Sequence, residues 1–520
     1  MPIKTIIRKN AYHDSVTLMA ISGKISVMAG VSDAVVAMAT AMNKELLERV
    51  GMLSAEVAEC EANDLVIAVK ADTDEICGEA AAMVDELLTK RTAGGGSQNE
   101  QRPATVASAV TLEPELNLAI ISTPGCYAAR EAMQALKNGL HVMMFSDNVT
   151  VEEEIALKEY AHDHGLLMMG PDCGTAIVNQ VGLCFANVVR AGDIGVIGAS
   201  GTGTQEVTVL IDQFGGGVSQ VLGTGGRDLS EAVGGIMMLD CLAALGRDEN
   251  TSVIVLISKP PAQAVADKIL AEVKKSTKPV VVCFINGDPA PVEQAGAIFG
   301  GTLEATARKA VLLSLGQPAA IADCEPKPLL ALAAGIRAKL RPEQKYVRGL
   351  FCGGTLCDEA LHIVKAKTGR AFSNVAKDKE SRLSDPHTSK ENSFIDLGDD
   401  VFTVGRPHPM IEPSLRLPRV LAEARDPEVA VLLLDVELGF GSHEDPAGML
   451  LPAIREAQET ARREGRHLEI IAYVCGTAGD KQDKAEQERK LAEAGVTLVE
   501  SNARGAYLAA AIVAGGGVNE

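Results

Sequence analysis

The sequence predicts an α/β protein with several parallel-sheet domains, Rossmann-like and flavodoxin-like, and a small N-terminal α+β unit. Its 520 residues are more than one hydrophobic core can use. Apolar residues make up 47% of the chain, but aromatic residues make up only 3% and Trp is absent, so the cores must be mainly aliphatic, as in helix-covered parallel sheets. From about residue 103, short aliphatic strands alternate with helical periods, which is typical of parallel strands joined by crossover helices.

The N-terminal α+β domain is predicted to occupy residues 1–92. Strands are expected at 3–8, 32–39 and 64–69. Helical periods accompany them, for example at 43–52 and 75–90. Glycines and polar residues fill 92–102. Because such residues cannot pack a core, this stretch is predicted to be a flexible linker.

Three parallel-sheet domains are predicted after the linker, at 103–190, 191–316 and 345–520. Their strands are expected at 116–123, 141–146, 166–170, 193–198, 217–226, 251–258, 278–287, 346–354, 394–400, 429–439, 468–476 and 496–501. The second domain closes with a helix near 303–315. The stretch 316–345 is rich in Pro and charge and contains one amphipathic helix, which indicates a domain boundary.

Charge and cysteine usage limit the partners and the compartment. The formal charge of −20 and the pI near 5.0 argue against nucleic acid or an anionic membrane as the partner, since both need a basic field. Charges stand where a signal peptide would be apolar, and no stretch approaches the roughly 20 apolar residues that span a bilayer, so a cytoplasmic protein is expected. The eleven cysteines are scattered without a C-x-x-C pair. They are predicted to be reduced, buried thiols, and no metal site is predicted.

The strongest local motif is GVIGASGTGTQEV, in which a buried strand ends at Gly198 and a helix opens near Thr204. Amide N–H groups at a helix start, together with the helix dipole, favour an anion such as phosphate or carboxylate. The residues expected to bind it are Ser200, Gly201, Thr202, Gly203 and Thr204. A tight strand-to-helix turn without a ligand is the alternative, with equal weight for the motif alone.

Two similar turns occur later in the chain. FCGGTLCDEA places Gly353 and Gly354 before a helix, and ELGFGSHEDPAG places Gly439, Gly441, Ser442 and His443 before another. None of the three turns is a Walker sequence, because no G-K-[ST] follows the glycines. Three such turns in one chain favour a shared anionic ligand.

Three further polar residues are candidates for binding or catalysis. Arg227 in GTGGRDLS suits a carboxylate or phosphate, and an ordinary surface ion pair is the alternative at even weight. Arg406 and His408 stand in GRPHPMI, where two prolines fix the backbone around the histidine. Taken alone, this motif slightly favours a structural role for His408 over a functional one. Cys173 in MGPDCGT is interpreted as a packed or binding-loop cysteine, since no partner histidine accompanies it.

The order of these motifs resembles the FdrA-like branch of the acyl-CoA synthetase superfamily over essentially the whole chain. The motifs that carry the resemblance are MMFSDNV (143–149), MGPDCGT (169–175), GASGTG (198–203), GGRDLS (225–230), SKPPA (258–262), IDLGDD (395–400) and GRPHPMI (405–411). The resemblance implies a CoA-binding-like Rossmann domain at 103–190, a ligase domain at 191–316 similar to the succinyl-CoA synthetase α-subunit, and a flavodoxin-type domain at 345–520 similar to its β-subunit. It also implies two facing helix starts, matched here to 198–204 and 439–443.

The chain departs from the superfamily at two positions of chemical importance. The active-site loop of the superfamily corresponds to EQAGA (293–297), which puts Gln294 where the phosphate-carrying histidine stands. The glutamate that orients this histidine is replaced by Lys259. An amide cannot form the phosphoenzyme, while a lysine attracts phosphate. No segment matches an ATP-grasp domain, so nucleotide use would need another subunit.

The resemblance leaves three functions open. FdrA-like proteins are linked to carbamoyl transfer involving oxamate in purine and allantoin breakdown, so the first expectation is a carbamoyl or acyl transferase that uses phosphate or carbamoyl phosphate without a phosphohistidine. Lys259, Gln294 and His408 are then expected at the reacting group, and Arg227 or Arg406 at a carboxylate. The second is a CoA-dependent acyl-CoA ligase component with a separate ATP-grasp subunit, and the third is a non-catalytic metabolite-binding scaffold. A homo-oligomer with separately encoded companion subunits is expected.

Overall fold

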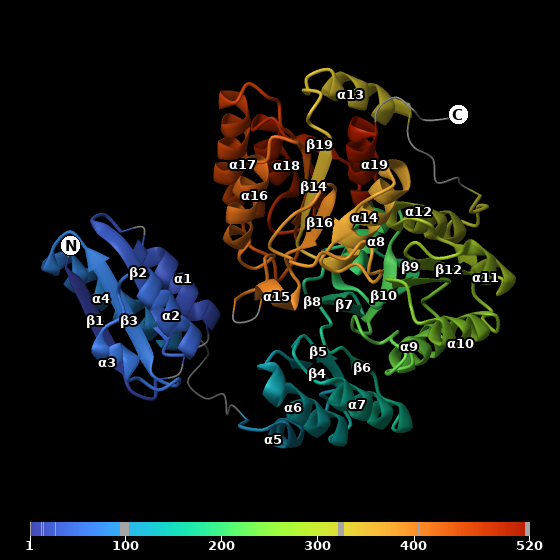
Figure 1. Cartoon of the computed structure of the whole chain (residues 1–520). Helices are drawn as coiled ribbons and strands as arrows, with labels where there is room; N and C mark the ends of the chain where they lie inside the picture. Colours follow the sequence, from blue (N-terminus) through green and yellow to red (C-terminus); the bar gives the residue numbers. More distant parts are fainter. Residues whose placement is uncertain are drawn as a thin grey trace. The chain divides into compact units, whose positions relative to one another are not determined.

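A computed structural model of the protein describes residues 2–11, 13, 15–26, 28–93, 103–320, 327–403 and 406–514. The chain divides into two compact units, Met1–Pro103 and Ala104–Glu520 (Figure 1). The predicted linker 92–102 lies almost wholly outside the described residues, as do positions 404 and 405 of the GRPHPMI region. No helix in the described ranges combines the length and the apolar composition needed to cross a bilayer.

The first unit is an antiparallel sheet with helices on both faces, drawn in blue in Figure 1. Its elements are β1 (Ile3–Arg8), α1 (Ser15–Ser26), β2 (Val31–Met38), α2 (Ala41–Arg49), α3 (Ala55–Ala58), β3 (Leu65–Ala71) and α4 (Asp74–Ala93), with strand order β1-β3-β2. The central strand β3 is buried on both faces: Ile67 packs with α1 and α4, and Val66 packs with α2 and α3. The predicted strands and helices are confirmed, while α1 was missed.

The second unit begins with a small three-stranded parallel sheet, β4-β5-β6. Its elements are α5 (Val106–Leu112), β4 (Leu118–Ile121), α6 (Gly125–Lys137), β5 (His141–Met144), α7 (Val151–Asp163) and β6 (Met168–Met169). A capping box at Thr150 and Glu153 fixes the start of α7. This sheet follows the alternation that the sequence predicts.

A seven-stranded sheet follows, in the order β13-β12-β11-β9-β10-β7-β8. Its elements are β7 (Thr175–Val178), β8 (Val181–Cys184), β9 (Ala191–Gly198), α8 (Gly201–Gln213), β10 (Val218–Gly223), α9 (Ile236–Arg247), β11 (Val253–Ser258), α10 (Gln263–Val273), β12 (Val280–Phe284), α11 (Pro289–Gln294), β13 (Ile298–Phe299) and α12 (Leu303–Ser314). Strands β9 to β13 are parallel, whereas β7 and β8 form an antiparallel hairpin that extends the β10 edge.

The last sheet is six-stranded and wholly parallel, in the order β15-β16-β14-β17-β18-β19. Its elements are α13 (Lys327–Arg337), β14 (Tyr346–Phe351), α14 (Gly354–Thr368), β15 (Phe372–Ser373), β16 (Ser393–Asp396), α15 (Asp400–Thr403), η1 (Pro413–Arg416), α16 (Leu417–Ala424), β17 (Val429–Glu437), α17 (Pro446–Arg463), β18 (Glu469–Cys475), α18 (Lys484–Glu493), β19 (Thr497–Val499) and α19 (Asn502–Val513). The expected α/β class with a small N-terminal unit is confirmed.

Both large sheets change winding direction at their first parallel strand. In the seven-stranded sheet β10 lies on one side of β9, and β11 lies on the other. In the six-stranded sheet β16 and β17 flank β14 in the same way. Open α/β sheets bind ligands at such switch points, beyond the carboxyl ends of the strands. The helices that begin there are α8 after β9 and α14 after β14.

Helices α8 and α14 lie side by side in one continuous core that joins the two large sheets (Figure 1). Val207 and Leu210 of α8 pack in the same apolar cluster as Leu356 and Ala360 of α14. Because each helix begins at the crevice of its own sheet, this shared core brings the two crevices together.

Candidate functional site

The start of α8 is fixed by Ser200. The Ser200 hydroxyl accepts a hydrogen bond from the Gly203 amide at 3.1 Å, and the Thr204 hydroxyl donates to the Ser200 carbonyl at 2.5 Å. Strand β9 ends at Gly198 as predicted, but the helix begins at Gly201, three residues before the predicted start at Thr204, because Ser200 serves as the N-cap. Gly174 of the 169–175 loop lies against Gly201, with 3.7 Å between the Gly201 Cα and the Cβ position of Gly174.

The start of α14 faces the start of α8 at van der Waals distance. A methyl group on Gly353 would overlap the Thr202 side chain, and one on Gly203 would stand 2.6 Å from Cγ2 of Thr355. The Ser200 and Thr355 hydroxyls are hydrogen-bonded to each other across this contact. The N-terminal ends of two helices, both electropositive, therefore meet at one place.

The turn 439–443 was expected to face 198–204. The Gln205 side chain of α8 donates to the Leu438 carbonyl at 3.2 Å, just before this turn, but the glycines of the turn have other nearest neighbours. Gly439 and Gly441 pack instead against the segment 184–186 that follows β8, where Gly441 approaches the Phe185 ring. The Ser442 hydroxyl is buried without a hydrogen-bond partner, and the His443 amide donates to the Met410 carbonyl at 2.9 Å. The turn thus borders the 406–411 segment, and Gly353 and Gly354 take the facing position.

Lys259 reaches the start of α14 from the end of β11. Its ammonium group contacts the position that a Cβ on Gly354 would occupy, and a carboxylate oxygen of Asp396 lies 2.7 Å from the same position. Asp396 is the last residue of β16 and is buried. Burial raises the pKa of the Asp396 carboxyl to about 7, while the charge of Lys259 acts in the opposite direction. Asp396 was not among the predicted site residues.

His408 stands behind Asp396. Nε2 of His408 lies 2.5 Å from the Cβ position of Gly398, and its ring is tilted against Phe185 at 5.6 Å between centroids. Nδ1 accepts a long hydrogen bond from the Met410 amide at 3.3 Å. Loss of water around the ring lowers the pKa of His408 to about 4, so the imidazole is neutral at physiological pH.

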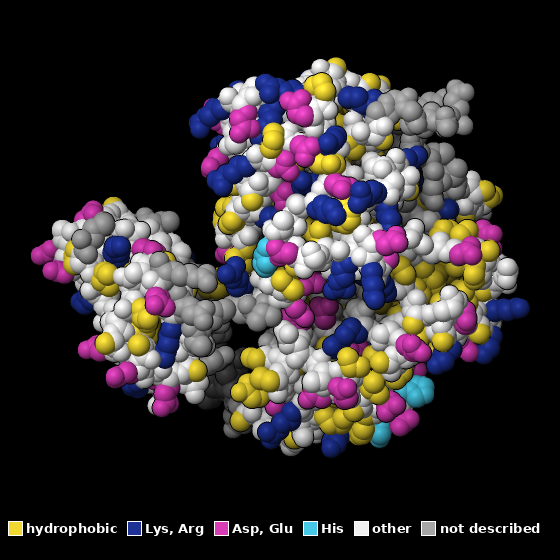
Figure 2. All heavy atoms as spheres, viewed as in Figure 1, with side chains coloured by type: hydrophobic (Ala, Val, Ile, Leu, Met, Phe, Trp, Pro, Cys, Tyr) yellow, Lys and Arg dark blue, Asp and Glu magenta, His cyan; other side chains and the backbone are white. Residues whose placement is uncertain are grey.

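An acidic recess adjoins Lys259. The Asp172 side chain is exposed at the surface. The surrounding protein still removes part of the water around its carboxyl, and this desolvation, followed by the negative charge of Asp147, raises its pKa to about 6. Burial, and after it the negative charges of Asp147 and Asp399, raise the pKa of the Asp400 carboxyl. Arg227 faces these carboxylates and is anchored by the Val149 carbonyl at 2.8 Å and by buried Glu154 at 3.0 Å. Figure 2 shows acidic side chains in a hollow of this unit with Lys and Arg side chains beside them.

Two predicted residues make no described contact with the helix starts. Gln294 is the last residue of α11 and is exposed, and in the described ranges no hydrogen bond or ion pair joins it to Ser200, Lys259 or Gly441. The Arg406 side chain is exposed, and its amide donates to the Thr403 carbonyl at 2.8 Å.

Cys173 is a packed residue, as predicted. Its thiol is buried and lies 3.5 Å from the Gly223 carbonyl, and burial raises its pKa to about 12. The described cysteines form no disulfide, although Cys126 is exposed rather than buried.

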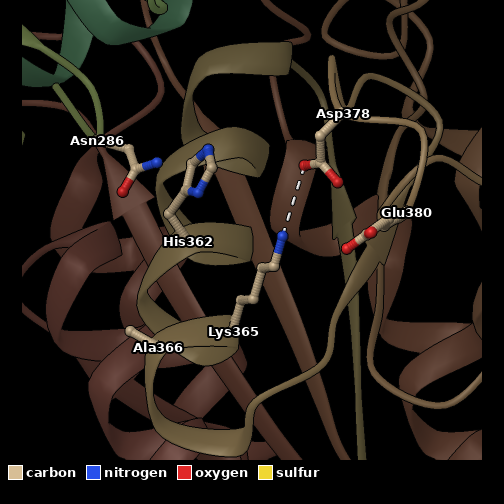
Figure 3. A pocket seen from close by; sticks show the side chains of 6 residues that line it. All are labelled: Asn286, His362, Lys365, Ala366, Asp378 and Glu380. Carbon is tan, nitrogen blue, oxygen red and sulfur yellow. Dashed lines mark hydrogen bonds and ion pairs between the residues drawn. The ribbon is translucent and has the colours of Figure 1, made fainter.

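A surface pocket of about 590 Å³ lies farther along α14 (Figure 3). It is lined by Asn286, His362, Lys365, Ala366, Asp378 and Glu380, and it contains none of the predicted site residues. Lys365 spans part of it, 3.5 Å from Asp378 and 2.7 Å from Ser381. The charges that line this pocket are therefore partly neutralised by one another.

Three protein-family models match the chain. Residues 1–104 match "AllF, heavy metal-associated domain", residues 189–286 match "CoA binding domain", and residues 350–512 match "CoA-ligase". The described residues of the first unit do not fit a metal ion, because Cys60 and Cys77 lie on opposite faces of its sheet. No group of three or more His, Cys, Asp or Glu residues in the described ranges is arranged to hold one.

The relatives agree with these matches. YahF of Escherichia coli K12 is 50% identical over 98% of this chain and 98% of its own length. The α-subunit of the ADP-forming succinate–CoA ligase of Methanothermobacter thermautotrophicus is 29% identical over 41% of this chain and 75% of its own. Among solved structures, an acetyl-coenzyme A synthetase of Candidatus Korarchaeum cryptofilum is 17% identical over 80% of this chain and 93% of its own, with a TM-score of 0.28.

Proposed function

The chain belongs to the FdrA-like branch of the acyl-CoA synthetase superfamily, and from this premise we propose that it transfers a carbamoyl or acyl group between phosphate and a small amide or amine acceptor at the facing starts of α8 and α14. An oxamate carbamoyltransferase-like reaction, with carbamoyl phosphate as the activated donor, is the specific form of this proposal.

The observation that carries the proposal is the convergence of two helix starts and one lysine. Each helix N-terminus acts as about half a positive charge and offers unpaired amide groups. The ammonium group of Lys259 adds a full charge at Gly354. Free amides, close backbone approach and a lysine are the usual means of holding phosphate.

Gln294 supports transfer without a covalent phosphoenzyme. Its amide has no nucleophilic nitrogen, and by the family resemblance it takes the sequence position of the histidine that accepts phosphate, although it is exposed at the end of α11. With that step lost, the reaction depends on positioning the donor and stabilising the charge of the departing phosphate. The amides at 201–202 and 354–355 and the hydroxyls of Ser200 and Thr355 would surround this phosphate.

Arg227 is proposed to bind the carboxylate of an acceptor such as oxamate. It is anchored by the Val149 carbonyl and Glu154, so little side-chain freedom is lost when it binds a ligand. Arg406 is the alternative clamp, and its exposed side chain would have to swing toward the recess.

A CoA-dependent ligase component is the second candidate. The match of residues 189–286 to the CoA binding domain favours it, as does the succinate–CoA ligase relative. Such a component would need an ATP-grasp partner subunit. The acidic recess of Asp147, Asp172 and Asp400 beside Lys259 opposes it, because CoA carries several negative charges.

Calorimetric titration of the full chain separates the candidates. Inorganic phosphate, carbamoyl phosphate, CoA and ATP are added in turn, and formation of carbamoyl phosphate from oxalurate and phosphate is assayed in parallel. Binding of phosphate and carbamoyl phosphate without CoA supports transfer. Binding of CoA supports the ligase component, and absence of binding by all four supports a scaffold.

Lys259→Ala tests the site itself. Loss of a charge-assisted contact of about 1.5–3 kcal/mol should weaken phosphate binding about 10- to 100-fold and abolish phosphate-dependent turnover. Lys275→Ala is the matched control, since Lys275 is exposed and forms a surface ion pair with Glu272. Equal phosphate affinity in the two variants would remove Lys259 from the site.

A further inference from the structure

Asp396 occupies a fixed position at the phosphate side of the helix starts. Its Oδ1 accepts a hydrogen bond from the Gly398 amide at 2.9 Å, and its Oδ2 points to Gly354. Asn374 holds the backbone of Asp396 on both sides: Asn374 Oδ1 accepts from its amide at 2.9 Å, and Asn374 Nδ2 donates to its carbonyl at 3.0 Å. The direction of the carboxylate is therefore set by the fold.

The groups around Asp396 leave Oδ2 available for a proton. Lys259 faces it from the end of β11, Asp399 from its own loop, Asp435 from β17 and Cys357 from α14. Lys259 and the Gly398 amide stabilise the carboxylate, while burial and the two aspartates destabilise it. These opposing effects hold the pKa of Asp396 at about 7, where a carboxyl group both accepts and returns protons.

His408 is less suited to the same role. Its pKa of about 4 leaves it neutral, and since Nδ1 accepts the Met410 amide, the proton of the ring belongs on Nε2. Nε2 is directed at Gly398, beside Oδ1 of Asp396. His408 thus borders the loop of Asp396 as a neutral ring rather than as a base.

We propose that Asp396 is the proton-transfer group for the reaction at the facing helix starts. The inference rests on the proposed function. As the acceptor nitrogen forms its bond to the carbamoyl or acyl carbon, one N–H proton passes to Oδ2 of Asp396. The carbon–oxygen bond to the phosphoryl group breaks, its electron pair leaves with the phosphate, and the proton then passes from Asp396 to that phosphate. Atoms and charge balance without a further reactant.

Asp396→Asn is the test of the catalytic step, because it keeps the size of the side chain and an oxygen for the Gly398 amide. The rate of phosphate-dependent cleavage of oxalurate is measured from pH 5.5 to 8.5. Phosphate itself titrates in this pH range, so both proteins should show an acid limb from the substrate. The wild-type kcat/KM should fall more steeply on the acid side, with a second titration near pH 7, and the variant should lose this second titration and about 100-fold or more in rate. Asp163→Asn, at an exposed position of α7, is the matched control.

Sulfate binding gives a second readout that does not depend on turnover. Sulfate keeps its charge across this pH range, so the titration of Asp396 should weaken sulfate binding as pH rises through about 7. The variant should bind sulfate as tightly at pH 8.5 as at pH 5.5. Asp396→Glu, which keeps a carboxyl group, should retain the pH dependence with a shifted midpoint and serves if the asparagine variant does not fold.

The outcomes distinguish the two proposals. A wild-type chain without phosphate-dependent transfer, but with the Asp396-dependent change in sulfate affinity, overturns the proposed function and supports the titration of Asp396 at the anion site. A variant that keeps wild-type turnover and its second titration overturns the inference about Asp396. The same pH dependence of sulfate binding in wild type and Asp396→Asn overturns it as well.

Discussion

Gly353→Ala tests whether the two helix starts touch. The backbone at Gly353 is extended (φ −155°), so alanine meets no conformational strain there, and any effect must come from space. The new methyl group would stand 2.9 Å from Cβ of Thr202 and would overlap its Oγ1 and Cγ2. Rotation of the Thr202 side chain moves the last two atoms but not Cβ. The helix starts must therefore separate by roughly 1 Å to restore ordinary contacts of about 3.5–4.0 Å.

The cost of this separation is about 1–3 kcal/mol, the usual range for overpacking. A displacement of about 1 Å in a phosphate-binding arrangement also costs about 100-fold in rate. Gly353→Ala should therefore lower the calorimetric unfolding midpoint and weaken phosphate binding together. Gly246→Ala is the control, because nothing lies within 4 Å of its Cβ position near the end of α9. There alanine should stabilise the helix by about 0.5–1 kcal/mol.

A double-mutant cycle makes the test specific. Thr202→Ala removes Oγ1 and Cγ2, so Thr202→Ala/Gly353→Ala should recover part of the lost stability, with a coupling of about 0.5–3 kcal/mol. Additive effects of the two changes would show that Gly353 and Thr202 are not in contact. A Gly353→Ala variant with unchanged melting and unchanged phosphate affinity would refute the facing arrangement on which the site is built.

Two stability predictions follow from buried charge. Arg416→Met should lower the free energy of unfolding by about 3–5 kcal/mol in urea titration, because it leaves buried Asp435, 2.9 Å from the guanidinium, without its charged partner. The control Arg463→Met changes an exposed residue and should have little effect. Equal effects of the two substitutions would contradict this prediction. Burial raises the pKa of Glu437 well above its usual value. The contribution of protonated Glu437 to the free energy of unfolding is therefore complete below about pH 4.5, and it is lost as the pH rises through the raised pKa. Glu437→Gln should therefore flatten the fall in stability between pH 5 and 8, unlike Glu249→Gln on the surface, and an unchanged slope would disprove it.

The fold was predictable because buried parallel strands read as uninterrupted aliphatic runs. VAVLLLDVELG and TSVIVLIS became β17 and β11 with shifts of only one or two residues. Helix α1 was missed, since SVTLMAISGKIS mixes β-branched and small residues without a clear polar face. The β7–β8 hairpin was missed although a signal exists. Asn179 and Gln180 both adopt positive φ, as a two-residue hairpin turn requires, and aliphatic residues flank them.

The site was only partly predictable, because sequence motifs identify helix starts but not their partners. Three glycine turns were candidates, and the choice between 353–354 and 439–443 depends on strand order. Strand β14 is the switch-point strand of its sheet, whereas β17 is its neighbour, so the turn after β14 meets α8. Asp396 was overlooked within IDLGDD. Its position as the acidic residue that ends a buried strand was the available signal.

Charge balance connects the two replacements that the family resemblance implies, Lys259 for a glutamate and Gln294 for a histidine. The helix starts and Lys259 together present about two positive charges, and Asp396, with a pKa near 7, cancels only part of them at neutral pH. A glutamate in place of Lys259, as the resemblance implies for the superfamily, would cancel most of this field, which suits a site that must orient an imidazole and receive its phosphate only briefly. With Gln294 there is no imidazole to orient, and a carboxylate would repel free phosphate. The two proposed replacements would therefore act in the same direction: Lys259 makes the helix starts a better place for an unattached phosphate dianion, and Gln294 removes the side chain that would be phosphorylated.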